Sequence, residues 1–207
     1  MIKEVMVVVN IQGQDYLSPT WDECGQICFK LAKQILIENP PIDRVVALAK
    51  GGWTWAKAMS DYLGVKNIAS IQYEFYKQIA ETTDSPILKQ PLPVSIQGER
   101  ILIFDDIADS GKTLEKAVEY LAKSGADVIL TSTLFTKPFS SFTPNYYGES
   151  TAAWIVFPHE IRETIELLNN KWTNNGMTRA ELMSNLEKIG IDRDLIDYFL
   201  NNEKLNK

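Results

Sequence analysis

Residues 100–113 read RILIFDDIADSGKT, and this stretch decides how the chain is interpreted. Ile101 to Phe104 form a continuous apolar run of strand length, which is typical of a strand buried on both faces of a parallel sheet. The polar segment from Asp105 to Lys112 is expected to be a loop. The residues after it share one helical stripe, made of Leu114, Ala117, Val118 and Leu121. The pattern predicts a strand, a loop and a helix in succession.

The same alternation of strands and helices is found on both sides of this stretch. Arg44 to Ala49 form another apolar run, followed by Lys50-Gly51-Gly52 and a helical segment that is closed by Gly64. Further strands are expected at residues 67–76 and 128–135. Alternating strands and helices favour an α/β fold with a parallel central sheet and flanking helices, and ligands of such sheets bind beyond the carboxyl ends of the strands.

Capping boxes and apolar stripes predict helices before and after this α/β region. Thr20 and Glu23 form a capping box, which predicts a helix from Trp21 to about Ile37. From Ile161 onward only helical patterns occur, with a second capping box at Thr178 and another helix at residues 191–200. We therefore expect a domain at residues 1–165 and a C-terminal helical appendage at 166–207. The polar, proline-containing segment 77–98 is expected to be a small hood or lid.

Composition indicates a folded protein without a membrane or nucleic-acid partner. The chain has 207 residues, 45% of them hydrophobic and 23% charged, and a formal net charge of −6. This net charge disfavours binding to nucleic acid or to anionic lipid. The apolar run from Val5 to Val9 is too short for a signal peptide, and the expected location is cytoplasmic. Cys24 and Cys28 lie one helical turn apart and are expected to be buried in the core rather than joined in a disulfide.

The loop after the strand at 100–104 has the residues of a phosphate-binding turn. Backbone N–H groups at a helix N-terminus favour an anion, so Ser110 to Thr113 are expected to hold a phosphate monoester, with Gly111 permitting a close approach. A triphosphate-binding loop would need a glycine where the chain has Asp106. The acidic residues beside the turn instead suit the hydroxyls of a sugar or a magnesium ion.

Residues 101–114 resemble the phosphoribosyl pyrophosphate signature of type I phosphoribosyltransferases. The resemblance implies the type I phosphoribosyltransferase fold, with Asp105 and Asp106 binding the ribose hydroxyls directly or through Mg²⁺. It assigns the 5-phosphate to Ser110, Gly111, Lys112 and Thr113, with Ile107, Ala108 and Asp109 completing the loop. Relatives more often have threonine at the position of Ser110.

The turn Lys50-Gly51-Gly52 is similar to the pyrophosphate loop of this family. In members that act on 6-oxopurines, the peptide before the basic residue is often cis, so the resemblance implies a cis bond between Ala49 and Lys50. Lys50 would offset the charge of the leaving pyrophosphate.

Two further segments, 136–138 and 154–160, resemble the xanthine-guanine and hypoxanthine phosphoribosyltransferases. The resemblance implies that Lys137 donates to O6 of the base, that Trp154 stacks on it, and that the backbone of Ile155 reads its far edge. A lysine donor suits the acceptor at C6 of a 6-oxopurine and disfavours adenine. His159 stands where relatives often carry an aromatic residue, which leaves open whether Glu160 contacts the 2-substituent.

The expected function is the transfer of a phosphoribosyl group from phosphoribosyl pyrophosphate to hypoxanthine, xanthine or guanine. Asp109 would accept the proton of the purine, and Lys50 and Lys137 would assist. The expected cofactor is Mg²⁺, and relatives suggest a homodimer or homotetramer. Two alternatives stay open: a phosphoribosyltransferase for another base, and a regulator that binds phosphoribosyl pyrophosphate without turnover.

Overall fold

The computed structural model describes residues 6–38, 40–75 and 85–201 of the chain. The chain divides into two compact units. The larger unit contains residues 24–152. The smaller unit combines the residues up to Glu23 with those from Ala153 onward. The predicted division into a domain at 1–165 and an appendage at 166–207 stays a prediction.

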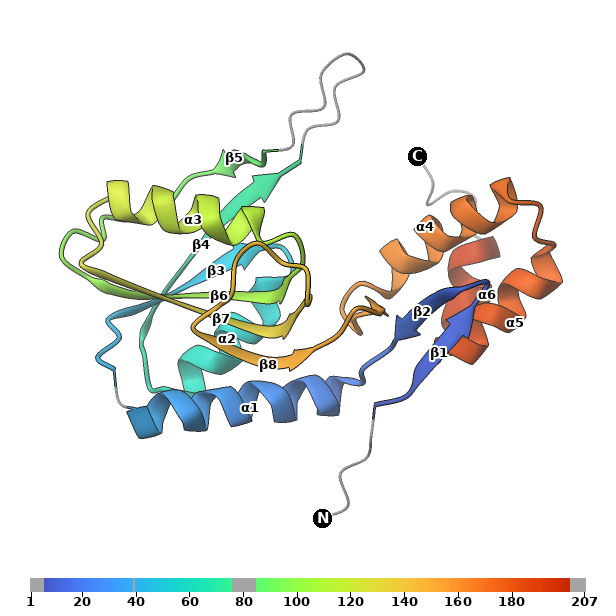
Figure 1. Cartoon of the computed structure of the whole chain (residues 1–207), viewed down its shortest axis with the longest axis horizontal. Helices are drawn as coiled ribbons and strands as arrows, with labels where there is room; N and C mark the ends of the chain where they lie inside the picture. Colours follow the sequence, from blue (N-terminus) through green and yellow to red (C-terminus); the bar gives the residue numbers. More distant parts are fainter. Residues whose placement is uncertain (1–5, 39, 76–84, 202–207) are drawn as a thin grey trace. The chain divides into compact units, whose positions relative to one another are not determined.

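The larger unit is built on a six-stranded sheet with the strand order β5-β4-β3-β6-β7-β8 (Figure 1). Its strands are β3 (Arg44–Ala49), β4 (Asn67–Glu74), β5 (Ile87–Gln90), β6 (Arg100–Ala108), β7 (Val128–Thr136) and β8 (Tyr146–Ser150). The edge strand β5 pairs antiparallel with β4, and all the other pairs are parallel. The predicted α/β fold with a parallel central sheet is confirmed, with one antiparallel strand added at its edge.

Strand β6 is longer than predicted. It continues to pair with β7 as far as Ala108, which lies opposite Thr136. Its described pairing with β3 ends earlier, at Ala47 and Phe104. The prediction that the loop begins at Asp105 is therefore wrong, because the ladder with β7 holds Asp105 and Asp106 in extended backbone.

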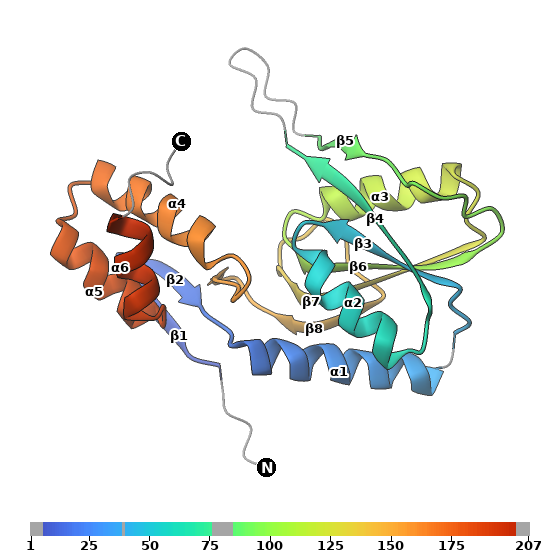
Figure 2. The same cartoon turned by 180° about the vertical axis from the view of Figure 1, so that it is seen from behind.

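Three helices cover the sheet of the larger unit. Helix α3 (Lys112–Lys123) lies on one face, and α2 (Gly52–Tyr62) and the part of α1 (Trp21–Glu38) that belongs to this unit lie on the other (Figures 1 and 2). Ile101 and Ile103 of β6 belong to the hydrophobic cluster with α3. Leu102 and Phe104 alternate to the opposite face and are also buried. The prediction of a strand buried on both faces is confirmed.

Helix α1 begins and packs as its sequence predicts. The backbone N–H of Glu23 donates to Oγ1 of Thr20 at 3.1 Å, and the N–H of Thr20 donates to Oε2 of Glu23 at 2.7 Å. Cys24 and Cys28 are buried and form no disulfide, and burial raises the pKa of Cys28 to about 12. Both cysteines are therefore core residues, as expected, and the raised pKa of Cys28 makes its thiol unreactive.

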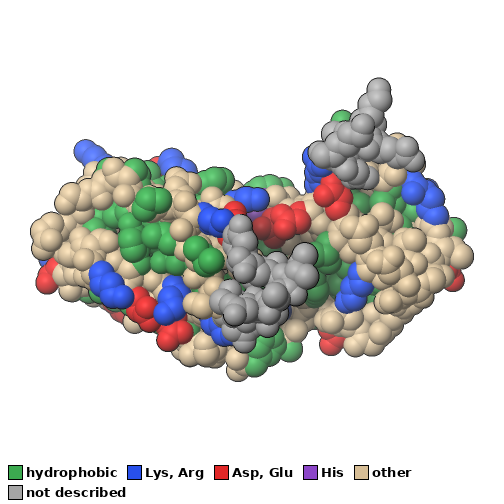
Figure 3. All heavy atoms as spheres, turned by 90° about the horizontal axis from the view of Figure 1, so that it is seen from above, with side chains coloured by type: hydrophobic (Ala, Val, Ile, Leu, Met, Phe, Trp, Pro, Cys, Tyr) green, Lys and Arg blue, Asp and Glu red, His purple; other side chains and the backbone are tan. Residues whose placement is uncertain are grey.

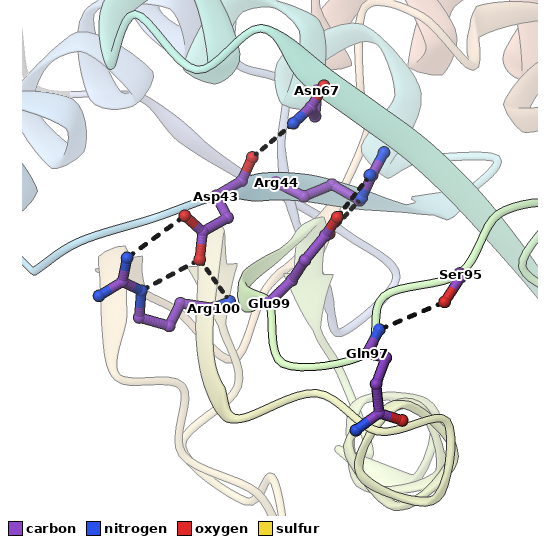
Figure 4. Close-up of polar contacts among 7 residues, drawn as sticks. All are labelled: Asp43, Arg44, Asn67, Ser95, Gln97, Glu99 and Arg100. Atoms are coloured by element: carbon purple, nitrogen blue, oxygen red, sulfur yellow. Dashed lines mark hydrogen bonds and ion pairs between the residues drawn. The ribbon is translucent and has the colours of Figure 1, made fainter.

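Two ion pairs connect β3 and β6 at their amino ends (Figure 4). Nε and the second terminal nitrogen of Arg44 donate to the Glu99 carboxylate at 2.6 and 2.8 Å. Asp43 accepts from the backbone N–H of Arg100 at 2.8 Å and from its Nε at 3.0 Å. These contacts join the central strands at the end opposite to the predicted binding loops.

The smaller unit combines a three-stranded sheet with three helices. Strands β1 (Val8–Ile11) and β2 (Gln14–Leu17) form a hairpin, and β9 (Trp154–Ile155) pairs parallel with β2. The helices are α4 (Ile161–Asn174), α5 (Arg179–Ile189) and α6 (Arg193–Asn201). Tyr16 and Trp172 are buried in their common core, and Thr178 forms the predicted capping box. Among the residues that the structure describes, no helix combines the length and apolarity needed to cross a membrane.

Candidate active site

The carboxyl ends of three neighbouring strands carry most of the predicted site. Strands β3, β6 and β7 are adjacent and parallel, so the segments that follow them emerge at one edge of the sheet. These segments are Lys50–Gly52 after β3, the loop after β6, and Lys137 after β7. The fold thus brings together two loops and a lysine that lie up to 87 residues apart in the sequence.

A cavity of about 190 Å³ lies at the end of β6. Its lining includes most of the predicted phosphoribosyl-binding loop: Asp105, Ile107, Ala108, Asp109, Ser110, Gly111 and Thr113, together with Leu114 of α3 and Phe75. Phe75 directly follows β4 and was not predicted as a site residue. The position of an aromatic side chain just beyond the carboxyl end of a strand is the only sequence signal that points to it.

Gly111 is required by the geometry of this loop. It caps the N-terminus of α3 with a φ of 84°, a backbone conformation that residues with a Cβ rarely adopt. A Cβ at this position would also lie 2.6 Å from the backbone nitrogen of Phe142. Within the described ranges, the N–H groups of Gly111 and Thr113 make no hydrogen bond. They are donors at a helix N-terminus beside a cavity, which is the arrangement that binds an anion.

The loop after β3 contacts the acidic end of β6. A Cβ on Gly51 would collide with the carboxylate of Asp106, and a Cβ on Gly52 would collide with the carbonyl oxygen of Phe104. Only glycine allows the two segments to approach so closely. The peptide between Ala49 and Lys50 is cis, which confirms that expectation, and Lys50 is exposed.

Asp105 and Asp106 have the donor chemistry that a magnesium ion requires. Asp106 is buried, and its backbone N–H donates to Oδ1 of Asp105 at 3.0 Å. Mg²⁺ prefers carboxylate oxygens and is usually bound by one or two carboxylates together with water and substrate phosphates. Asp105 lines the cavity and the carboxylate of Asp106 lies against Gly51 of the neighbouring loop, so each offers oxygen ligands of the type that Mg²⁺ prefers.

Lys137 is a buried cation next to the loop. Only 8% of its surface is exposed, and its backbone N–H donates to the carbonyl of Ala108 at 3.0 Å. Burial lowers the pKa of Lys137, and the negative charge of Asp109 opposes that shift. The two groups that the resemblance assigns to proton transfer and base recognition therefore act on each other electrostatically.

The segment from Ser140 to Phe142 contacts the phosphate-binding turn and was missed by the sequence analysis. Ser141 donates to the carbonyl oxygen of Ser110 twice, from its backbone N–H at 3.1 Å and from Oγ at 2.8 Å. Ser140 Oγ donates to the carbonyl of Phe142 at 2.9 Å. Two serines after a lysine are an ordinary loop sequence, so no signal in the sequence could have identified this contact.

The predicted base-binding residues after β8 belong to the smaller unit. Trp154 is half-buried; its ring centroid lies 6.5 Å from that of Tyr16, and Nζ of Lys171 lies 5.7 Å from it. Ile155 is buried opposite Leu17 of β2. His159 and Glu160 are partly exposed. The roles of these residues toward a base stay predictions. In the predicted lid, residues 77–84 lie outside the described residues.

Comparison with known proteins agrees with the loop geometry. The family model described as "Phosphoribosyl transferase domain" matches residues 20–163. The chain is 29% identical over 149 residues to a xanthine-guanine phosphoribosyltransferase of Gluconobacter oxydans, which covers 71% of this chain and 86% of the relative. A purine phosphoribosyltransferase of Pyrococcus horikoshii is similar in structure, with a TM-score of 0.63 and 33% identity over 70% of this chain and 93% of that one.

A relative with a different name is also similar. The transcriptional regulator GfcR of Methanothrix thermoacetophila is 30% identical over 140 residues, covering 62% of this chain and 68% of the relative.

Proposed function

The chain belongs to the phosphoribosyl transferase domain family, as a type I phosphoribosyltransferase, and on this premise we propose that it converts a 6-oxopurine base to its nucleoside monophosphate. Phosphoribosyl pyrophosphate is the donor, and hypoxanthine, xanthine or guanine is the acceptor. The observation that carries the proposal is the junction of Gly51 with Asp106, because it joins the pyrophosphate loop to the acidic end of the ribose loop.

The loop after β6 binds the sugar phosphate in this proposal. The free N–H groups of Gly111 and Thr113 and the hydroxyl groups of Ser110 and Thr113 receive the 5-phosphate at the N-terminus of α3. Asp105 and Asp106 face the ribose hydroxyls. Asp105 and Asp106 would hold Mg²⁺, which would supply positive charge near the pyrophosphate of the substrate. Lys50 and the backbone of Gly51 and Gly52 stabilise the same group as it leaves.

The reaction breaks the bond between C1 of the ribose and the pyrophosphate oxygen and forms a bond between C1 and a purine nitrogen. Asp109 accepts the proton that this nitrogen loses, a contribution on the order of 10²–10⁴-fold in rate. Lys137 donates a hydrogen bond to O6 of the base. Its burial supports this role, because a donor in a dry environment discriminates strongly between an acceptor and the amino group of adenine.

A base panel tests the proposal. The protein is incubated with phosphoribosyl pyrophosphate, Mg²⁺ and one of hypoxanthine, xanthine, guanine, adenine or uracil, and the pyrophosphate and nucleotide formed are measured. We expect turnover with at least one 6-oxopurine and none with adenine. The Lys137→Met variant should lose turnover while it still binds phosphoribosyl pyrophosphate in calorimetry. If none of the three 6-oxopurines led to pyrophosphate release, or if adenine were turned over equally fast, the proposal would be contradicted.

A regulator that binds phosphoribosyl pyrophosphate is the second candidate, and the similarity to GfcR is the observation that favours it. The net charge of −6 opposes binding to nucleic acid. On the face drawn in Figure 3, outside the grey residues, Lys and Arg side chains lie in separate groups among Asp and Glu. Salt-sensitive binding of duplex DNA, measured in the same preparations that fail to turn over any base, would favour this candidate.

A further inference from the structure

The carbonyl group of Ser110 is held by a residue outside helix α3. Helix α3 begins after Gly111, and its first backbone hydrogen bond runs from the N–H of Glu115 to the carbonyl of Gly111 at 3.0 Å. The carbonyl of Ser110 takes no part in the helix. It accepts instead from the backbone N–H and from Oγ of Ser141, at 3.1 and 2.8 Å.

These two bonds set the orientation of the next N–H group. The peptide between Ser110 and Gly111 is trans, so its C=O and N–H point in opposite directions. With the carbonyl held by Ser141, the N–H of Gly111 is directed away from Ser141. Gly111 lines the cavity of the binding loop, and its N–H makes no hydrogen bond within the described part of the chain.

The segment that carries Ser141 is itself fixed at both ends. The N–H of Ser140 donates to the carbonyl of Lys137 at 3.1 Å, and the N–H of Lys137 donates to the carbonyl of Ala108 at 3.0 Å. At the other end, Phe142 packs against the hydrophobic cluster that contains α3. Movement of Ser141 relative to the turn is therefore restricted.

We infer that Ser141 is a positioning residue for the 5-phosphate: its two hydrogen bonds hold the Ser110–Gly111 peptide so that the Gly111 N–H is presented to the phosphate. Without the hydroxyl of Ser141, the peptide retains only one of its two anchors. The Gly111 N–H is then less well oriented before the ligand arrives, and binding has to supply the ordering. The inference rests on the proposed function, because it assumes that this loop binds the phosphate of the sugar.

Ribose 5-phosphate is the ligand that tests the inference, since it carries the 5-phosphate and lacks the pyrophosphate. Ser141→Ala should weaken its binding in calorimetry about fivefold, the value of one net hydrogen bond. Binding of free pyrophosphate with Mg²⁺, which the other loop receives, should stay unchanged. Ser141→Thr keeps a hydroxyl and should restore most of the affinity.

Ser124→Ala is the matched control. Its Oγ donates to the carbonyl of Tyr120 at 2.9 Å, so the change removes one hydroxyl bond to a backbone carbonyl at the far end of the same helix. This variant should bind ribose 5-phosphate like the parent protein. If Ser141→Ala melts well below Ser124→Ala, the comparison is made instead with Ser141→Cys, a side chain of similar size and a weak donor.

The outcomes separate the inference from the proposed function. Unchanged ribose 5-phosphate affinity in Ser141→Ala, or equal losses for ribose 5-phosphate and pyrophosphate, would overturn the positioning role. A parent protein that does not bind ribose 5-phosphate would overturn it as well. A parent that binds ribose 5-phosphate but turns over no base refutes the proposed function alone, and the role of Ser141 is then decided by the binding data.

Discussion

Replacing Gly51 with alanine should move Asp106 and reduce catalysis. Gly51 has a φ of −54° and a ψ of −41°, which alanine adopts without strain, so the effect comes from the added methyl group alone. That Cβ would lie 2.5 Å from Cγ and 2.6 Å from Oδ1 of Asp106. Ordinary contact begins at 3.4 Å, so Cγ of Asp106 has to withdraw by about 0.9 Å, and the nearer oxygen Oδ2 by slightly more.

A displacement of this size has a large kinetic effect. A misplacement of about 1 Å in a catalytic group costs roughly 100-fold in rate, equivalent to about 2.7 kcal/mol. We therefore expect kcat/KM for phosphoribosyl pyrophosphate to fall about 100-fold in Gly51→Ala. The assay follows nucleotide formation from the preferred 6-oxopurine while phosphoribosyl pyrophosphate is varied. The free energy of unfolding should fall by about 1–3 kcal/mol, the usual cost of overpacking.

Gly25→Ala provides the control for this experiment. Gly25 lies within α1, and a Cβ there would make only an ordinary contact with Trp55 at 4.0 Å. This variant should keep full activity and gain about 0.5–1 kcal/mol of stability, since alanine favours a helix. If Gly51→Ala kept the kinetic constants of the parent, the close approach of the two loops would have no bearing on catalysis.

Three further predictions concern charged groups. Asp109→Asn should lower kcat by about 10²–10⁴-fold, and steady-state rates with each purine check this. Burial lowers the pKa of Lys137, and the charge of Asp109 opposes that shift. If base binding requires the Lys137 ammonium, base affinity measured against pH should decline at a pH below the usual lysine range, and Asp109→Asn should move this decline to lower pH. A pH profile that the substitution leaves unchanged would contradict the coupling. A double-mutant cycle with Arg44→Met and Glu99→Gln should give a coupling of about 1 kcal/mol at pH 7 in urea unfolding. Arg44 lowers the pKa of Glu99, so the coupling energy should vanish as the pH falls through that lowered pKa. A coupling energy that persisted in acid would show that it does not come from the charged Glu99 carboxylate.

The sheet and its loops could be predicted because their signals are local. The segments expected to be strands at residues 44–49 and 128–135 match β3 and β7 within a residue. For β3 the signal is the run of apolar side chains that a strand buried on both faces needs. The capping boxes at Thr20 and Thr178 were equally reliable, because each requires only residues within one helical turn.

The short strands carried no such signal. The hairpin β1–β2 turns at Gln12 and Gly13, both with positive φ, and its strands of four residues are too short to show a clear alternation. Strand β8 includes Gly148, where only glycine fits because a Cβ would collide with Ile27 and with the carbonyl oxygen of Leu134. A composition-based interpretation treats such a glycine as part of a turn.

Contacts between distant segments were not predictable either. Ser141 lies 31 residues from Ser110, and its hydrogen bonds depend on the adjacent placement of β6 and β7. The extension of β6 to Ala108 has the same origin, because the polar residues Asp105 and Asp106 stay in the ladder only where β7 offers a partner.

The pairing of β2 with β9 affects how the chain can fold during translation. Tyr16 lies opposite Trp154 and packs edge-to-face on Trp172. Tyr16 is synthesised long before these partners, and residues 24–152, which form one contiguous unit, are synthesised in between. During that time the aromatic side chain of Tyr16 in the N-terminal hairpin has neither partner to cover it. A nascent chain arrested before Trp172 should therefore remain sensitive to protease at the hairpin, and chaperones that bind exposed aromatic residues would find their target there.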